Sequence, residues 1–161
     1  MKHKMLMLAA LVLGISAARA EIVRLPIPNS TFPIAQAVRV TGDSVITYVS
    51  GQVPPLINKD ADPQTPAAYG DVKTQTVGVF NRIKSILEGQ GLGMADVIKM
   101  QVFLVHDARA PMDFKAFMEG YTQFFGGPQP NLPARSVIGI ASLANPGFLV
   151  EIEVVAAKDS K

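Results

Sequence analysis

Hydrophobic and polar residues alternate in two ways along this chain. Apolar side chains recur at every second position in several short stretches, which predicts strands, and every three to four positions in two longer ones, which predicts helices. After a short edge strand, the predicted elements run strand, strand, helix, strand, helix, strand, strand. This order predicts an α+β fold with one sheet and both helices on one face. The predicted strands are residues 22–25, 36–40, 45–50, 97–105, 133–141 and 148–155.

Two aspartates mark the expected helix starts. Asp71 can cap a helix that runs to about residue 90, and Gly91 is expected to follow its end as the C′ residue. Asp113 can cap a second helix, in which aromatic residues between 114 and 125 fall at helical spacing. That aromatic stripe is typical of a core and is less typical of a ligand-stacking surface.

Turn residues divide the N-terminal half. Residues 41–44 predict a hairpin turn between strands 36–40 and 45–50. Ser50 and Gly51 come next, and glycine there permits a bulge or the close approach of a ligand, although composition alone favours a strand-ending turn. Residues 54–70 contain four prolines and show no periodicity. A loop of that length is usually a lid, an interface arm or a mobile segment.

The last two predicted strands carry the charges of most chemical interest. Side chains of a strand point alternately to opposite faces of the sheet. If Ile138 and Ile140 face the core, Arg135 lies on the other face, together with Glu151 and Glu153 of the following strand. Residues 144–147 predict the turn that joins these two strands. The alternation alone favours a structural ion pair between Arg135 and Glu151 at an interface over a ligand site.

Residues 1–20 predict a secretory signal peptide. A basic start is followed by an apolar run over residues 5–15 and by Ala18-Arg19-Ala20. The run is shorter than the roughly twenty residues that span a bilayer, and a chain without cysteine cannot carry a lipoprotein anchor. We therefore expect a periplasmic or secreted domain, residues 21–161, with no membrane attachment after cleavage.

Charge and composition remove two classes of function. Lys2, Lys4 and Arg19 account for three positive charges, so the formal net charge of +2 becomes −1 once the leader is removed. Such a domain gives no support to nucleic-acid binding, which needs a cationic face. Only His106 remains among the histidines, and zinc sites need several His or Cys ligands, so no metal site is expected. His106 and its neighbour Asp107 follow the central strand and are expected in a solvated loop rather than as an acid–base pair, because adjacent side chains point apart. A half-apolar open sheet face indicates coverage by another subunit.

Several motifs, taken in order, resemble the reactive intermediate deaminase family, the YjgF/Rid proteins. The resemblance extends over nearly all of residues 21–161, and each fragment alone is weak. The fragments are Val49-Ser50-Gly51-Gln52-Val53-Pro54, Gln75-Thr76 with Asn81 and Ile83, residues 97–103, Pro133-Ala134-Arg135-Ser136, and Val150-Glu151-Ile152-Glu153.

The resemblance implies a chorismate-mutase-like homotrimer with ligand sites between subunits. It implies that Arg135 binds the substrate carboxylate, that Glu151 positions and polarises the attacking water, and that Ser50 and Gly51 line the cleft. The implied reaction is hydrolysis of 2-imino or 2-enamino acids to 2-oxo acids and ammonia. No cofactor is expected, because an imine is already electrophilic.

Three departures from the family pattern keep other functions open. Val137 stands where the deaminases commonly have cysteine, Ala37 where a tyrosine is expected, and Met118 where an asparagine is expected. Loss of polar groups favours, as an alternative, a non-catalytic trimer that binds small carboxylates or acts as a holdase chaperone. A third option is hydrolysis of larger imine-like or amide substrates in a more apolar cleft.

Overall fold

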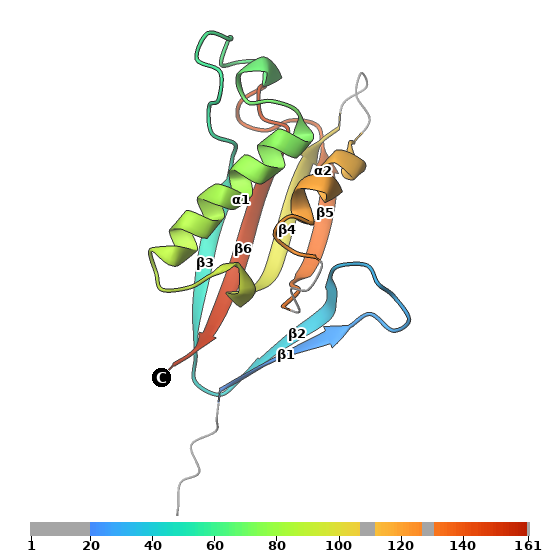
Figure 1. Ribbon diagram of the computed structural model, residues 1–161, viewed down its shortest axis with the longest axis vertical. Coiled ribbons are helices and arrows are strands. Elements are labelled where there is room, and N and C mark those ends of the chain that lie inside the picture. The colour runs from blue at the N-terminus through green and yellow to red at the C-terminus, as the bar shows by residue number, and fades with distance from the viewer. Residues whose placement is uncertain (1–19, 107–111, 127–130, 161) are drawn as a thin grey trace, which may run out of the picture.

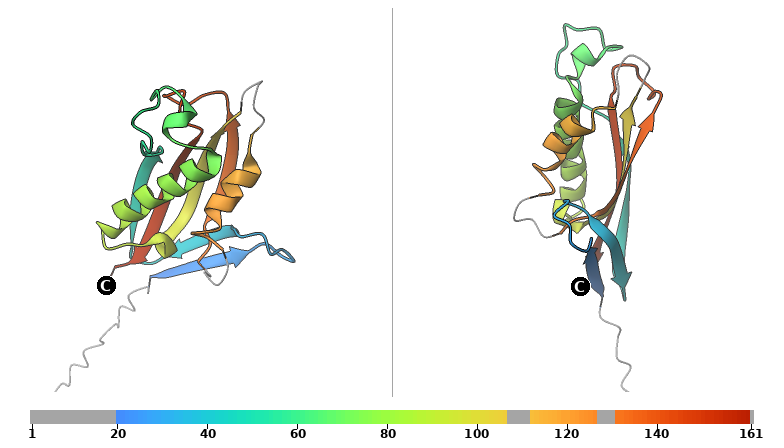
Figure 2. Two further views of the ribbon diagram at one scale, coloured as in Figure 1. Left: turned by 45° about the horizontal axis from the view of Figure 1, so that its top comes forward. Right: turned by 90° about the vertical axis from the view of Figure 1, so that its right-hand side faces the viewer.

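Two helices pack on one face of a six-stranded sheet in this computed structural model (Figure 1). The structure describes residues 20–106, 112–126 and 131–160, so the predicted leader lies almost entirely outside the described residues. The side view in Figure 2 separates the helical layer from the sheet, which confirms the predicted α+β arrangement. The helices are α1 (Val72–Glu88) and α2 (Phe114–Tyr121), with 3₁₀ turns η1 (Pro66–Ala68) and η2 (Met94–Asp96), and the strands are β1 (Glu21–Pro26), β2 (Ala35–Thr41), β3 (Ser44–Gln52), β4 (Val97–Val105), β5 (Ala134–Ile140) and β6 (Val150–Asp159).

Both helices begin at the residues that the sequence indicates. The Asp71 carboxylate accepts a hydrogen bond from the Thr74 amide, and Asp113 accepts one from the Ala116 amide. The end of α1 differs from the expectation, because Gly89 is its C-cap. Gly91, with φ of 70°, instead turns the chain so that the Leu92 amide donates to the Leu87 carbonyl.

The strands follow the order β1-β2-β5-β4-β6-β3. β4 lies at the centre, parallel to β5 and antiparallel to β6. The prediction that β5 and β6 are neighbours joined by a simple turn is therefore wrong. The connection through residues 141–149 has to pass over the end of β4, which is inserted between the two strands (Figure 1).

The predicted hairpin between β2 and β3 is also wrong. β2 pairs with β1 in an antiparallel hairpin, whereas β3 pairs with β6 at the opposite edge of the sheet. The two strands diverge at Gly42 and Asp43 (Figure 1). β1 does form an edge, as expected. The alternation of β2 is satisfied by either neighbour, so the sequence pattern does not distinguish the two pairings.

The core lies between the helices and the inner face of the sheet. Val150, Ile152 and Val154 of β6 are buried there, as the sequence predicts. The aromatic stripe of α2 and the following turn is also core, since Phe117, Tyr121 and Phe125 are fully buried. Within the described part of the chain, no helix is long and apolar enough to span a bilayer.

Candidate functional site

Arg135 points toward the helices, on the face opposite to the one predicted. It lies at the start of β5, where its register partner on β4 is Met100, a fully buried core residue. Residues paired across neighbouring strands share a face, and Arg135 therefore faces α2. The residues expected to face the core lie on the other side, and Ile138 is 41% exposed. β5 carries apolar residues on both of its faces, so the sequence pattern allows either face to point toward the core.

Aromatic rings surround the guanidinium of Arg135. Its carbon Cζ lies 4.1 Å from the ring centroid of Tyr121 and 5.3 Å from that of Phe117. Phe32, which precedes β2, and Phe114 add rings at 5.4 Å and 5.9 Å. Each ring face attracts a cation electrostatically. The cluster thus offsets part of the cost of placing a charged group against the core.

Burial affects the protonation of this cluster in two ways. It lowers the pKa of Arg135, an effect that the neighbouring Tyr121 opposes, and the guanidinium remains charged because arginine does not lose its proton in proteins. Burial also raises the pKa of Tyr121 to about 12. The phenol is therefore neutral at physiological pH, and its hydroxyl donates to the Pro33 carbonyl oxygen at 2.7 Å.

Within the described ranges, Arg135 has a side-chain hydrogen bond with the Tyr121 hydroxyl and a weak one with a sulfur, and no carboxylate partner. Its Nη1 donates to the Met118 sulfur at 3.4 Å, and thioether sulfur is a weak acceptor. The salt bridges found there are Lys73–Glu119 and Lys84–Glu88, neither of which involves Arg135. A guanidinium has five N–H donors in a planar fork. The group is thus equipped to bind a carboxylate through two hydrogen bonds.

Glu151 lies on the open face of the sheet, beside Gly51. The strand-ending turn that composition favours at Gly51 is wrong, because β3 continues to Gln52, and the bulge that glycine also permits is present as a register shift against β6 between Val49 and Gln52. The shift brings the Gly51 backbone under the Glu151 carboxyl group, so closely that a side chain at position 51 would overlap it. The sequence therefore needs glycine here for a close approach within the chain.

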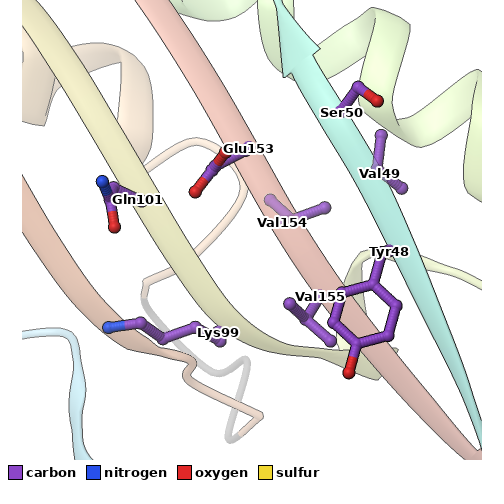
Figure 3. A pocket seen from close by; sticks show the side chains of 8 residues that line it. All are labelled: Tyr48, Val49, Ser50, Lys99, Gln101, Glu153, Val154 and Val155. Atoms are coloured by element: carbon purple, nitrogen blue, oxygen red, sulfur yellow. The ribbon is translucent and has the colours of Figure 1, made fainter.

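A shallow pocket of about 220 Å³ opens on the same face (Figure 3). β3 contributes Tyr48 and Ser50, β4 contributes Lys99 and Gln101, and β6 contributes Glu153. Sequence reasoning missed Tyr48, Lys99 and Gln101. Lys99 and Gln101 are the two polar residues of β4 and stand at alternate positions around the buried Met100, a local pattern that could have identified them.

The structure does not bring Arg135 and Glu151 together. Ser50, Gly51, Glu151 and Glu153 share the open face, whereas Arg135 lies on the helix side. The prediction that one face carries the cation and both carboxylates is wrong. The alternative of a structural ion pair at an interface stays a prediction, because the sheet separates the two groups only within one chain.

The three departures from the family pattern occupy different surroundings. Met118 contacts Arg135 directly through its thioether sulfur. Val137 packs against the hydrophobic core, two residues beyond Arg135 on the same face. Ala37 lies in β2 opposite Leu25, away from both groups. His106 accepts a hydrogen bond from the Met112 amide, and Asp107, which the sequence predicts in a solvated loop with it, lies outside the described residues.

Comparisons with known proteins agree with this fold. The Endoribonuclease L-PSP family matches residues 27–158. A 2-iminobutanoate/2-iminopropanoate deaminase of Salmonella typhimurium is 34% identical over 131 residues, which are 81% of this chain and 91% of the relative. A RutC family protein of Pyrococcus abyssi is 34% identical over 82% of this chain and 91% of its own length.

A solved structure adds a bound ligand to the comparison. The crystal structure of Escherichia coli TdcF with bound serine aligns with a TM-score of 0.55 at 28% identity, covering 78% of this chain and 94% of that one. From the extent of the family match, the chain belongs to the Endoribonuclease L-PSP family, the YjgF/Rid proteins to which its motifs point.

Proposed function

We propose that this protein hydrolyses reactive 2-imino and 2-enamino acids to 2-oxo acids and ammonia. The observation that carries the proposal is Arg135, a half-buried cation held by aromatic rings, with no carboxylate partner within the described residues. Family membership and the deaminase named among its relatives support the same reaction.

In the proposed reaction, Arg135 binds the substrate carboxylate and fixes the neighbouring C2 atom. Water adds to C2 as the C=N double bond opens, and the nitrogen takes up a proton. The amino group of the resulting tetrahedral 2-amino-2-hydroxy acid then takes up a proton as the hydroxyl gives up its own, the C–N bond breaks, and ammonia leaves behind a 2-oxo acid. An enamine first accepts a proton at C3 to become the imine. Glu151 is the group proposed to orient the water and accept its proton.

We further propose that the active site is shared between subunits of a homotrimer. Arg135 and Glu151 of one chain lie on opposite sides of the sheet. A site that uses both must therefore take Arg135 from one subunit and Glu151 from its neighbour. The exposed apolar residues of the open face, among them Tyr48 and Ile138, support coverage by another copy.

The direct test measures 2-oxo acid release from an imino acid generated in situ by an amino-acid oxidase. Arg135→Ala is expected to lose about 100-fold or more in kcat/KM, because the carboxylate anchor is removed. The matched control is Lys115→Ala, which removes an exposed cation from α2, the helix that Arg135 faces. This variant is expected to keep full activity. An Arg135→Ala variant as active as the wild type would end the proposal. Carboxylate binding without turnover would identify the non-catalytic alternative.

Mixing two inactive variants tests whether the site is shared. Arg135→Ala and Glu151→Ala subunits, unfolded together and refolded, are expected to regain about one quarter of wild-type activity, because about one site in four pairs two intact residues. Each variant refolded alone stays inactive. If the mixture is as inactive as its components, the two residues do not act across an interface.

The same proposal places the mature protein outside the cytoplasm. The support is the leader pattern of residues 1–20. Fractionation of cells that express the full chain should recover the protein in the periplasm or medium, beginning near Glu21. Deletion of residues 2–20 should retain it in the cytoplasm.

A further inference from the structure

The side chains of α2 that adjoin Arg135 are almost entirely apolar. Phe114, Phe117 and Met118 recur three to four residues apart, so they share one face of the helix. The Met118 sulfur lies 3.4 Å from Nη1 of Arg135, and the centroids of the two rings lie 5.9 Å and 5.3 Å from its Cζ. Tyr121 completes the stripe, and its hydroxyl already hydrogen-bonds Arg135 and a backbone carbonyl. A group bound to Arg135 therefore meets apolar surface along the helix.

β5 extends this apolar surface beyond the guanidinium. Val137 follows Arg135 by two residues, so its side chain points to the same face of the sheet, roughly 7 Å along the strand. Val137 and Met118 both pack against the hydrophobic core and are only partly buried. Packing fixes the positions of the two side chains, and partial burial leaves some of each accessible to a ligand.

The polar residues nearest in sequence are directed elsewhere. Lys115 and Glu119 of α2 are exposed and fall outside the apolar stripe, and the Glu119 carboxylate pairs with Lys73 of α1 at 3.2 Å. Ser136 lies between Arg135 and Val137 in β5, so its side chain points to the opposite face of the sheet. The charge of Arg135 is thus set in an apolar surface formed by one helix and one strand.

A 2-imino acid held through its carboxylate presents its side chain to this surface. The carboxylate carbon is bonded to C2, and C2 carries both the imine nitrogen and C3. When Arg135 holds the carboxylate, C3 and the atoms beyond it lie next to the residues that flank the guanidinium, which include Met118 and Val137. An apolar pocket distinguishes substrates that differ by one methylene by about 10-fold to 200-fold in kcat/KM. A difference of several carbons is therefore readily selected here.

We propose that Met118 and Val137 select 2-imino acids with large apolar side chains, such as those formed from leucine or methionine, over the small imino acid formed from alanine. This assignment rests on the proposed deaminase activity and names the substrate class of the same site. The alanine-derived imino acid has only a methyl group at C3, which leaves the apolar surface in contact with water. A longer side chain covers that surface in the transition state as well, and so raises kcat/KM.

The first test compares the imino acids that an amino-acid oxidase forms from leucine and from alanine, with catalase present to remove peroxide. Release of each 2-oxo acid above its spontaneous rate gives kcat/KM for each substrate. We expect the leucine-derived imino acid to be preferred by at least about tenfold. Equal values, or a preference for the alanine-derived imino acid, would overturn the proposal.

Polar substitutions of similar size test the two residues themselves. Met118→Gln and Val137→Thr are each expected to lower the preference by about threefold or more, because a larger side chain would then desolvate a polar atom. The matched controls are Met94→Gln and Val72→Thr, which make the same changes at partly buried positions outside α2 and β5 and should keep the wild-type preference. The preference is a ratio measured on one preparation, so partial unfolding of a variant does not change it. A preference unchanged in both test variants would overturn the assignment.

Binding measurements separate a failure of this selection from a failure of the proposed function. If the wild type hydrolyses neither imino acid, the deaminase activity fails. Calorimetry with pyruvate and with 4-methyl-2-oxopentanoate then decides the selection, because the two 2-oxo acids share the carboxylate and differ only in the side chain. Binding of the larger 2-oxo acid that is tighter by about tenfold or more supports the selection. Equal or undetectable binding of the two overturns it.

Discussion

The two faces of the sheet hold their charged groups in opposite ways. On the helix side, the Arg135 guanidinium is half-buried against Tyr121 and its neighbouring rings. On the open side, Lys99, Glu151 and Glu153 stand on adjacent strands around a shallow pocket and a bulge. Aromatic rings can therefore stabilise a charged group at a half-buried position. The stability of that group then depends on how the rings are packed around it. The charged side chains of the open face are instead stabilised by solvent and by contacts with the neighbouring strand.

The largest expected difference between the faces concerns the packing of phenylalanine. Phe117→Ala removes a fully buried ring that contacts Arg135, Phe114 and Tyr121. We expect it to lower the free energy of unfolding by about 3–5 kcal/mol, the usual cost of such a cavity.

Phe103→Ala makes the same change on the open face, where Phe103 is partly exposed. In the single chain it should cost about 1 kcal/mol or less. Urea unfolding of both variants, at a protein concentration where the chain is monomeric, measures the contrast. Equal losses would mean that the open face is packed as tightly as the core.

The second prediction uses the raised pKa of Tyr121. An unfolded tyrosine ionises near pH 10, whereas the pKa of Tyr121 in the folded protein is about 12. Its contribution to stability is therefore complete below pH 10 and is lost as the pH rises to 12, by roughly 2–3 kcal/mol. Tyr121→Phe cannot ionise and should lack this part of the decline. Unfolding free energies measured from pH 9 to pH 12 for both proteins give the difference, and parallel curves would contradict the prediction.

Sequence reasoning succeeds in this protein where the chemistry is local. Asp71 and Asp113 cap the helices because a carboxylate can reach an amide three residues ahead. β4 is predicted with its observed bounds because it is a run of nine residues rich in β-branched and apolar side chains, as is typical of a buried strand. The family motif singles out Arg135 and Met118, and the structure places the two side chains in contact.

The same reasoning fails where non-local pairing decides. Whether Arg135 or Ile138 faces the core depends on which β4 residue lies beside it, and sequence alternation cannot specify that partner. The turn at Gly42 fits a β2–β3 hairpin, yet β2 pairs with β1 instead. The ring cluster around the guanidinium combines Phe32 with α2, two segments far apart in sequence.

The third prediction concerns the contact between the bulge and Glu151. Gly51→Ala adds a methyl group that overlaps the Glu151 carboxyl, the movable end of a side chain. We expect the carboxylate to shift at a cost of about 1 kcal/mol or less in stability, and activity to fall toward that of Glu151→Ala. In the Glu151→Ala background the same change should have no further effect on activity. A double-mutant cycle measures this, and additive losses would show that position 51 acts independently of the carboxylate.

The smallest change in the stability of the single chain is expected on the open face of β3, and it separates the two faces most sharply. Tyr48→Ser removes a side chain that is 80% exposed, so unfolding of the isolated chain should change by about 0.5 kcal/mol or less. If another subunit covers this face, the same substitution should raise the concentration at which the oligomer dissociates by about tenfold or more. Val45→Ser, three residues earlier on the opposite face of β3, is the matched control, and its effect on dissociation should be small. Sedimentation equilibrium measures both. Equal dissociation of the two variants would mean that the open face is not the covered one, and the shared arrangement of Arg135 and Glu151 would lose its structural basis.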